Sequence, residues 1–590
     1  MKAKIGIRPV IDGRWGGIRE GLENQTMQMA KAAKKLIEEN VFYADGSPAE
    51  VVISPCTIGG GKEAAVCADY FQKENVTATL TVTPCWCYGT ETMDLDPLTT
   101  KAVWGFNGTE RPGAVYLAAA MAAHAQRGLP AFAIYGEDVQ DIGMSGITPD
   151  VEEKILRFAR CALAVGQIKN KAYVSIGSVA MGIGGSFLDA NKMQKYFGIR
   201  AEWVDMSEIL RRIDLEIYDK AEYEKELAWI KANCKEGKDN NGGIWGQKDF
   251  TREELDKQWE FVAKMTLIIK DIMLGNDKLN EIGRHEEALG RNAILAGFQG
   301  QRMWTDYKPN GDYTEAILNS TFDWNGKKQP LLLATESDNC NGLAMLFENL
   351  LTGQASAFAD VRTYWSPKAV ERVAGWKPTG KAKNGFMHLI NSGAAALDAT
   401  GVCKDKDGNP VMKKWTDVTD KDIAAMMKAT EFSPANRGYF RGGGFSSTFS
   451  TAAEMPVTLV RVNNVEGIGY TIQIAEGWTV VLPEKVNKTL LDRTDPTWPS
   501  TWFVPRLNET NAFSSVYNVM ANWGANHGAF TYGHIGKDLI TLASMFRIPV
   551  TLHNIEDKDI WRPHAWSAFG TKDLEGADFR ACANYKELYK

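Results

Sequence analysis

The chain has 590 residues, of which 44% are hydrophobic and 24% are charged, and its formal net charge is -6. This length exceeds what one hydrophobic core usually organises, so we expect three domains. The composition is typical of a folded globular protein and excludes a largely disordered chain. The small negative charge offers no basic surplus for a nucleic-acid partner, and we expect a small-molecule substrate.

Targeting signals and disulfides are not indicated by the sequence. The amino terminus runs from Met1 into strand-like sequence without the pattern of a secretory signal. No apolar run approaches the roughly 18 to 20 residues that span a bilayer, so we expect no membrane partner and a cytoplasmic location. The nine cysteines are scattered, and the close pair Cys85 and Cys87 forms only half of a zinc motif, which favours ordinary structural cysteines.

Residues 1–170 alternate short apolar runs with helical patterns. We expect strands at 4–11, 51–54, 78–82 and 131–135. Helices should begin near residues 24, 63 and 113. Strands that alternate with helices predict parallel β-α-β units, so this segment should form a first Rossmann-like α/β domain.

Residues 171–355 continue the same alternation. Strands are expected at 172–176, 201–204 and 331–335, and a polar loop with Asn240-Asn-Gly-Gly243 should precede a long helix from about Arg252 to Gly275. Gly182 and Gly184 lack the third glycine of a dinucleotide-binding turn, because residue 187 is Phe. The segment therefore predicts a second Rossmann-like α/β domain with a plain β-α turn at that place.

Residues 356–590 differ in character. Short segments rich in Val, Thr, Ile and Trp, such as 457–462, 470–474 and 478–482, are divided by turn residues and by few long helices. We expect a β-rich, barrel-like domain. The predicted fold class is α/β, with two Rossmann-like α/β domains followed by this β-rich C-terminal domain.

Three residues combine the right chemistry for a metal site. Glu336 closes the strand 331–335, and the carboxyl ends of parallel strands are where ligands bind. Asp360 lies in apolar sequence, where burial is unfavourable unless a cation or hydrogen bonds compensate it. His527 lies among small residues that leave its imidazole room. Two carboxylates and one imidazole suit Mn²⁺ and leave positions for water and sugar hydroxyls.

Ordinary structural roles compete with this interpretation. Asp360 can pair with Arg362, and Glu336 can cap the helix that follows it. His534 and His553 are alternatives to His527. Spacing along the chain does not by itself bring residues 336, 360 and 527 together.

Several long stretches resemble the L-fucose isomerase family, from near the first residue to near the last. They are Ile5-Gly-Ile-Arg-Pro-Val-Ile-Asp-Gly-Arg14, Thr81-Val-Thr-Pro-Cys-Trp-Cys-Tyr-Gly89, Trp104-Gly-Phe-Asn-Gly-Thr-Glu-Arg-Pro-Gly113, Ala359-Asp-Val-Arg-Thr-Tyr-Trp-Ser-Pro367 and Ala521-Asn-Trp-Gly-Ala-Asn-His-Gly528. This resemblance implies that Glu336, Asp360 and His527 bind manganese and that the two carboxylates are the acid/base pair.

The resemblance also implies a three-domain subunit in a homohexamer whose active sites are completed by a neighbour, with Arg14 and Trp86 reaching across that contact. The candidates for sugar contacts are Gln299, Ser392, Tyr439, Trp498 and Asn526. Aromatic faces pack on the apolar side of a sugar, while polar side chains bind its hydroxyls. Core packing is the alternative for the tryptophans, of which the chain has 18.

The function expected from these observations is a Mn²⁺-dependent isomerisation of L-fucose to L-fuculose, and of D-arabinose to D-ribulose, through an ene-diol intermediate. A hydride shift between C2 and C1 is the competing chemical route. Domain boundaries are expected at 1–170, 171–355 and 356–590. An L-arabinose isomerase and a non-catalytic sugar-binding protein remain as alternative functions.

Overall fold

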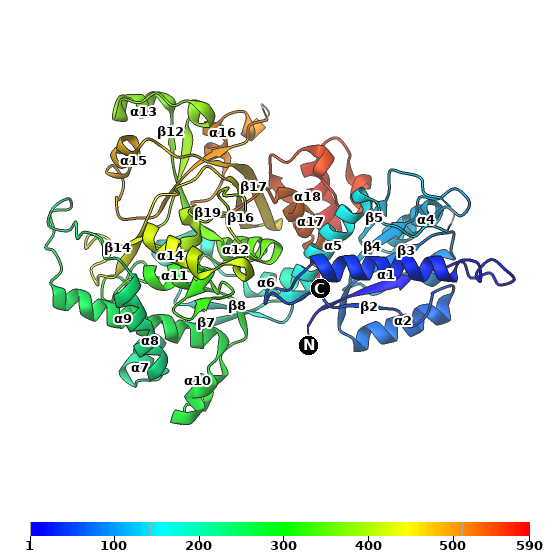
Figure 1. The fold of residues 1–590 in the computed structure, drawn as a ribbon, viewed down its shortest axis with the longest axis horizontal. Coiled ribbons are helices and arrows are strands. Elements are labelled where there is room, and N and C mark those ends of the chain that lie inside the picture. Colours follow the sequence, from blue (N-terminus) through cyan, green and yellow to red (C-terminus); the bar gives the residue numbers. More distant parts are fainter. Residues whose placement is uncertain (1, 142, 509–510, 590) are drawn as a thin grey trace.

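The computed structural model describes residues 2–141, 143–508 and 511–589, which form three large sheets and two two-stranded ones with helices around them (Figure 1). The first sheet has the order β2-β1-β3-β4-β5, and all its pairs are parallel. Its strands are β1 (Lys4–Pro9), β2 (Val51–Ile53), β3 (Val76–Thr83), β4 (Thr100–Gly105) and β5 (Ala131–Tyr135). Parallel pairing requires crossover helices, and these cover both faces of the sheet.

The four main helices of this domain form two layers. Helices α1 (Glu23–Asn40) and α5 (Pro149–Ile168) share one apolar cluster with the sheet. Helices α2 (Gly61–Lys73) and α4 (Gly113–Gln126) contribute to a second cluster on the other side. Successive residues of a strand point to opposite faces, so each strand supplies both layers.

The second sheet is also parallel, with the order β11-β8-β6-β7. Its strands are β6 (Ala172–Ile176), β7 (Arg200–Val204), β8 (Ala293–Phe298) and β11 (Leu332–Thr335). Helix α12 (Asn339–Thr352) packs on one face and α9 (Arg252–Leu274) on the other. The strand β11 lies at an edge of this sheet, and its last residue, Thr335, contacts Asn391 of the third domain.

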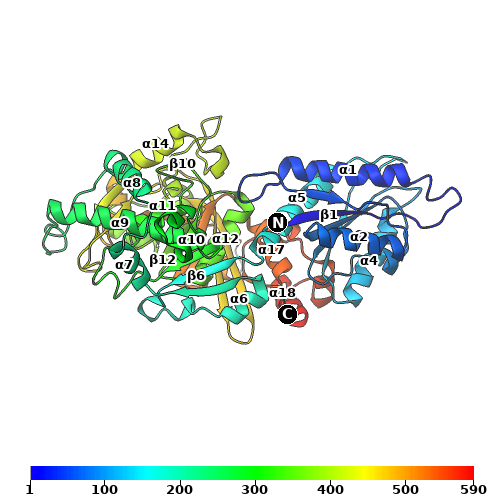
Figure 2. The same cartoon turned by 90° about the horizontal axis from the view of Figure 1, so that it is seen from below.

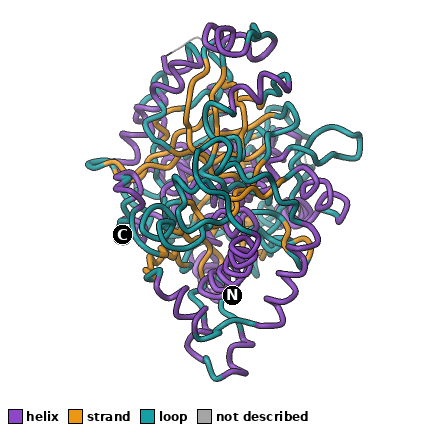
Figure 3. The backbone as a smooth tube through the Cα atoms, turned by 90° about the vertical axis from the view of Figure 1, so that its left-hand side faces the viewer, coloured by secondary structure: helices purple, strands orange, loops and turns teal. Residues whose placement is uncertain are grey.

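The third sheet closes into a six-stranded barrel in the order β16-β19-β12-β13-β18-β17, because β16 pairs with both β19 and β17. The strands are β12 (Ala357–Trp365), β13 (Phe386–Ile390), β16 (Pro456–Val465), β17 (Gly469–Thr479), β18 (Ser500–Pro505) and β19 (His527–Tyr532). A short strand, β20 (Val550–Leu552), pairs in parallel with β17 outside the barrel ring. In Figure 3 the strands cross the interior, while helices and loops lie around them.

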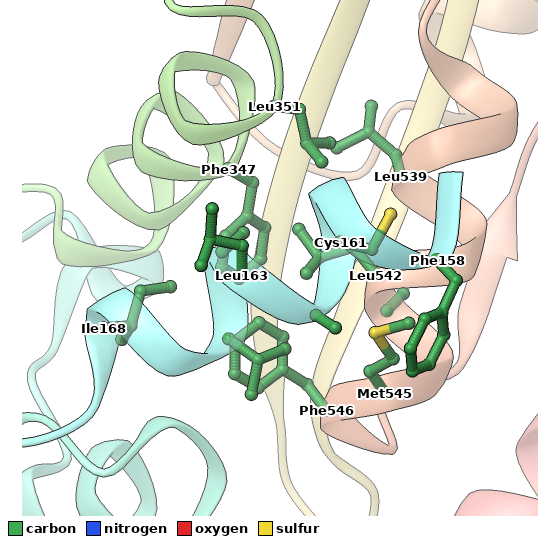
Figure 4. Close-up of a cluster of buried hydrophobic side chains, with 14 of the residues drawn as sticks. Phe158, Cys161, Leu163, Ile168, Phe347, Leu351, Leu539, Leu542, Met545 and Phe546 are labelled. Atoms are coloured by element: carbon green, nitrogen blue, oxygen red, sulfur yellow. The ribbon is translucent and has the colours of Figure 1, made fainter. Parts of the chain in front are cut away.

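A buried cluster joins the three domains. Figure 4 shows Phe158 and Leu163 of α5 beside Phe347 of α12 and Phe546 of α17 (Gly536–Phe546). The ring centroids of Phe347 and Phe546 lie 5.5 Å apart in a stacked pair. Helices α17 and α18 (Leu574–Tyr585) thus lie between the barrel and the first sheet (Figures 1 and 2).

The predicted fold class is confirmed, with differences in detail. The strand β4 was not expected, although it lies in the middle of the first sheet. The expected strand 470–474 and the first two residues of the expected strand 478–482 belong to one continuous strand, β17, because residues 475–477 also pair with β16; residues 480–482 lie beyond its end. Among the described residues, no helix is both long and apolar enough to cross a membrane.

Candidate active site

Glu336 follows the last residue of β11 in an unusual backbone conformation. Glu336 and Ser337 have φ angles of 57° and 53°, in the left-handed region that is costly by about 1–2 kcal/mol for each residue other than glycine. Backbone bonds hold the turn: the Ser337 N–H donates to Phe298 O (2.9 Å) and the Asp338 N–H to Thr335 O (3.1 Å). Such strain is typical of functional sites, and here it turns the Glu336 side chain toward the barrel domain.

Asp360 and His527 are brought together by strand register. Strand β12 runs antiparallel to β19, and Asp360 is directly opposite His527 in this ladder. Cross-strand partners have Cβ atoms only about 4.5–5.5 Å apart, so the two side chains share one place on the sheet. Residues that are 167 positions apart in the chain therefore become neighbours.

The three side chains meet at one atom of the imidazole. His527 Nε2 lies 3.2 Å from Glu336 Oε2 and 3.2 Å from Asp360 Oδ1. The side chains of His527 and Glu336 are buried, whereas that of Asp360 is 29% exposed. The sequence-based expectation that residues 336, 360 and 527 converge is therefore met in space, while their role in binding metal stays a prediction.

A third carboxylate holds the other side of the imidazole. His527 Nδ1 lies 2.6 Å from Asp338 Oδ2. Burial alone would lower the pKa of His527, but hydrogen bonds to Asp338, Asp360 and Glu336 outweigh it and raise the pKa well above its ordinary value. Three carboxylates thus surround one imidazole, which is the kind of environment that a cation prefers.

The donor set fits a divalent cation once the imidazole gives up its Nε2 proton. In the described part of the chain, no three His, Cys, Asp or Glu side chains are already spaced to hold an ion. Two carboxylates with one imidazole nitrogen nevertheless match the hard oxygen and nitrogen ligands of Mn²⁺. Proton and metal would compete for the same nitrogen.

Two of the candidate sugar contacts lie beside this cluster. Asn526 Nδ2 is 2.9 Å from His527 Nε2. Gln299 follows β8 and is 1% exposed. Its Oε1 accepts from the Ser178 N–H (2.7 Å), but its buried Nε2 has no hydrogen-bond partner. A buried donor without a partner is unfavourable in the free protein, so Gln299 has unused capacity for a ligand.

Ser392 follows the barrel strand β13 and Trp498 precedes β18, whereas Tyr439 lies in the loop between the short strands β14 (Glu431–Pro434) and β15 (Phe445–Thr448). The neighbour of Ser392, Asn391, donates its Nδ2 to Thr335 Oγ1 (2.9 Å), which places this loop beside Glu336. The rings of Tyr439 and Trp498 are 5.5 Å apart. Trp498 packs in a small cluster with Ile390, and its buried Nε1 has no hydrogen-bond partner.

Arg14 and Trp86 lie elsewhere. Arg14 pairs with Asp12 (Nη2 to Oδ2, 2.5 Å), and its side chain is 53% exposed. Trp86 is 38% exposed. Both belong to segments that follow strands of the first sheet. Figures 1 and 2 place the segment between β1 and α1 at the far end of the molecule from β12 and α9.

The structural roles considered as alternatives for Asp360, Glu336 and His527 are taken by other contacts. Arg362 extends over the Trp498 ring, with its Cζ 5.6 Å from the centroid. Helix α12 is capped by Asp338, whose side chain accepts from the Asn341 N–H, and not by Glu336. His534 Nε2 bonds Gly477 O, and His553 Nδ1 accepts from the Ile555 N–H, so both serve local structure.

Sequence reasoning missed three residues of this region. Gln301 donates its Nε2 to Glu336 Oε1 (3.4 Å), and Asp338 and Arg461 form a buried ion pair. Arg461 carried a signal, since a charge inside the apolar run Val457-Thr-Leu-Val-Arg-Val462 requires a buried partner. Asp338 resembled only a helix cap, and Gln301 had no distinguishing feature.

Comparisons with known proteins agree with this architecture. Three family models match in chain order: the first N-terminal domain of L-fucose isomerase over residues 2–170, the second N-terminal domain over 171–353, and the C-terminal domain over 389–554. These matches, together with two α/β domains and a barrel, identify an enzyme of the aldose-ketose isomerase class.

Full-length relatives specify the family. The chain is 59% identical over 587 residues to an L-fucose isomerase of Phocaeicola vulgatus and 59% identical over 591 residues to one of Clostridium perfringens. It is 58% identical over 589 residues to one of Streptococcus pneumoniae. Each comparison covers 100% of this chain and 99% of the relative. The chain belongs to the L-fucose isomerase family.

Proposed function

We propose that this enzyme interconverts L-fucose and L-fuculose, and also D-arabinose and D-ribulose, with Mn²⁺ as its cofactor. The observation that carries the proposal is that Glu336, Asp360 and His527, from two domains, meet at one place. His527 Nε2 lies 3.2 Å from a carboxylate oxygen of each acid. The names of the full-length relatives support the choice of L-fucose. D-arabinose has the same configuration at C2 to C4 and lacks only a methyl group, which a sugar site discriminates weakly.

Glu336, Asp360 and His527 would hold the ion, which when bound stabilises negative charge on the sugar oxygens. One carboxylate removes the proton from C2 of the open-chain aldose. The other moves protons at O1, O2 and C1, so the pair acts as general base and general acid around an ene-diol. Gln299, Ser392 and Asn526 donate hydrogen bonds to hydroxyls, while Trp498 and Tyr439 cover the apolar side of the sugar.

A metal-restoration assay tests substrate and cofactor together. The enzyme is stripped with a chelator, dialysed and assayed on L-fucose before and after addition of Mn²⁺. We expect loss of activity followed by recovery, with D-arabinose also turned over and L-arabinose turned over poorly. Full activity in the stripped enzyme, or a preference for L-arabinose, would contradict the proposal.

Solvent exchange tests the ene-diol route. When the reaction runs in D₂O, a proton that leaves C2 and returns to C1 exchanges with solvent, so deuterium should appear on the product carbon. A hydride shift keeps the original hydrogen. Product formed at normal turnover without any deuterium on carbon, measured by NMR, would count against the ene-diol route.

We also propose that the enzyme is a homohexamer in which Arg14 and Trp86 complete the active site of a neighbouring subunit. Both side chains are partly exposed, and the segment between β1 and α1, which carries Arg14, lies far from β12 and β19 of its own chain (Figure 1). Exposed Trp15, Trp86 and Tyr88 also give this end of the molecule an aromatic surface suited to a protein contact. Sedimentation velocity of the purified enzyme measures the assembly directly.

A further inference from the structure

Asp338 and Arg461 form the most buried ion pair near the candidate site. Arg461 Nη1 donates to Asp338 Oδ2 at 2.5 Å, and the side chains are 1% and 0% exposed. Arg461 lies in the middle of β16 in the barrel domain, whereas Asp338 follows β11 in the second domain. Removing two charges from water costs several kcal/mol for each ion, so such a pair is not retained for stability alone.

The oxygen that accepts from Arg461 also contacts the imidazole. Asp338 Oδ2 is 2.6 Å from His527 Nδ1, while Asp338 Oδ1 accepts from the Asn341 N–H (3.1 Å) at the start of α12. Asp338 is therefore fixed from three sides by an arginine, a histidine and a helix terminus. Because Nδ1 is engaged here, Nε2 is the nitrogen left to face Glu336 and Asp360.

Arg461 is itself held rigidly. Its Nε donates to Asn463 Oδ1 (3.1 Å) and its Nη2 to Gly185 O (3.3 Å), so it cannot follow Asp338 if that carboxylate moves. The chain of contacts runs from the second domain through Asp338 to Arg461 and His527 in the barrel. It fixes the imidazole relative to Glu336, which lies two residues before Asp338.

We propose that Asp338, anchored by Arg461, is a positioning residue that fixes the ring orientation of His527 and directs its Nε2 to the ion. This rests on the proposed function, since the ion is part of that proposal. Neither Asp338 nor Arg461 has a role in binding sugar here. A carboxylate on the second nitrogen of a metal-binding histidine sets its tautomer and its ring angle.

The test compares Mn²⁺ affinity between the wild type and Asp338→Asn, measured by the EPR signal of free Mn²⁺. Asparagine is also a good helix cap, so the start of α12 is preserved while the charge is removed. We expect the affinity to fall about 10- to 100-fold. The control is Asp578→Asn in α18. It breaks a buried ion pair between Asp578 and Arg562 and should leave Mn²⁺ affinity unchanged.

The melting temperature of the metal-free enzyme separates positioning from simple structural support. If Asp338→Asn melts earlier yet binds Mn²⁺ as tightly as the wild type, the pair is only structural and the inference is overturned. If that variant does not fold, Arg461→Lys replaces it: lysine keeps the charge, but its single nitrogen cannot reproduce the separate bonds of Arg461 to Asn463 and Gly185. Unchanged affinity in Arg461→Lys would equally overturn the inference, and a several-fold loss would support it.

The wild type distinguishes this inference from the proposed function. A wild-type enzyme that binds no Mn²⁺ contradicts the proposed metal site, and the inference fails with it. A wild-type enzyme that binds Mn²⁺ while Asp338→Asn binds it equally well contradicts the inference alone.

Discussion

At the scale of single residues, the candidate site depends on buried polar groups with incomplete partners. His527 is surrounded by three carboxylates, and Gln299 and Trp498 each keep a buried donor without a partner. Unsatisfied groups of this kind are rare because each is unfavourable by about 1–3 kcal/mol. The unpartnered donors of Gln299 and Trp498 are a physical reason to expect a polar ligand near these two side chains.

The first prediction concerns Glu336. Replacing Glu336 with Gln keeps the shape of the side chain but removes the charge that binds a cation and the oxygen that accepts a proton. We expect kcat to fall by at least about 100-fold, the usual range for loss of a general acid or base. The measurement is steady-state kinetics on L-fucose in saturating Mn²⁺.

Glu348→Gln is the matched control for this experiment. Glu348 is a buried glutamate on α12 whose Oε2 accepts from Ser356 Oγ (2.5 Å), and it has no role in the site. Its variant should keep near-normal kcat. Near-normal activity in Glu336→Gln would remove Glu336 from the catalytic pair.

The second prediction concerns Trp498. Trp498→Phe retains most of the aromatic face and removes the unpartnered Nε1 donor. We expect KM for L-fucose to rise about 2- to 10-fold, as for loss of one hydrogen bond, with a smaller change in kcat. Trp566 is the control, because its Nε1 is also buried without a partner but it lies in the C-terminal segment near Tyr585. Equal effects of the two substitutions would argue against a sugar contact.

At the scale of elements, the site is assembled by the ends and the register of strands. Strand β11 ends in a strained turn that carries Glu336, and the β12–β19 ladder sets Asp360 opposite His527. A shift of this register by one residue would turn every side chain of the strand to the other face. The long helices of the second domain support these strands, and one of them contains a pH-sensitive group.

The third prediction concerns Asp271 in the last turn of α9. Burial raises the pKa of this carboxyl to about 6, although Asn276 Nδ2 donates to it (3.3 Å). A raised pKa in the folded state means that its contribution to stability is complete below about pH 4 and is lost as pH rises through about 6. A negative charge at the carboxyl end of a helix is also unfavourable.

Asp271→Asn removes this loss. The advantage of the variant over the wild type in unfolding free energy should be about 1 kcal/mol greater at pH 8 than at pH 5. Thermal melts at both pH values measure it, with the exposed Asp277→Asn as a control. A difference that does not grow with pH would contradict the raised pKa.

At the scale of the whole molecule, the Glu336 cluster and the segment that carries Arg14 are far apart. The Glu336 cluster lies between the second domain and the barrel, whereas the segment with Arg14 lies at the opposite end (Figure 1). The buried cluster of α5, α12 and α17 packs the domains against one another. If both sets of residues serve one active site, they must come from different subunits.

The fourth prediction uses this separation. Glu336→Gln and Arg14→Ala are each expected to impair the pure enzyme. When the two variants are co-expressed with different tags and the mixed assemblies are purified, sites that combine an intact Glu336 with an intact Arg14 from a neighbour should recover part of the activity. Mixed assemblies no more active than the average of the two pure variants would show that each site is built from one chain.

Several elements could be predicted from residue patterns because their signals are local. The strand 131–135 and the helix from Arg252 coincide with β5 and with the start of α9, where a capping box at Thr251 and Glu254 begins the helix. Strand β4 was missed because Thr100-Lys-Ala-Val-Trp-Gly105 carries a lysine, which is buried in the structure. Lys101 is accommodated by Asp94 and by backbone carbonyls, which are contacts that no local pattern reveals.

The sequence by itself determined the fold class, the family resemblance and the residue types of the candidate site, because periodicity and motifs are properties of neighbouring residues. Only the tertiary structure decided which side chains share one place. The β12–β19 register and the Asp338–Arg461 pair arise from contacts between segments more than 100 residues apart. Such contacts form when domains pack, and one-dimensional spacing carries no record of them.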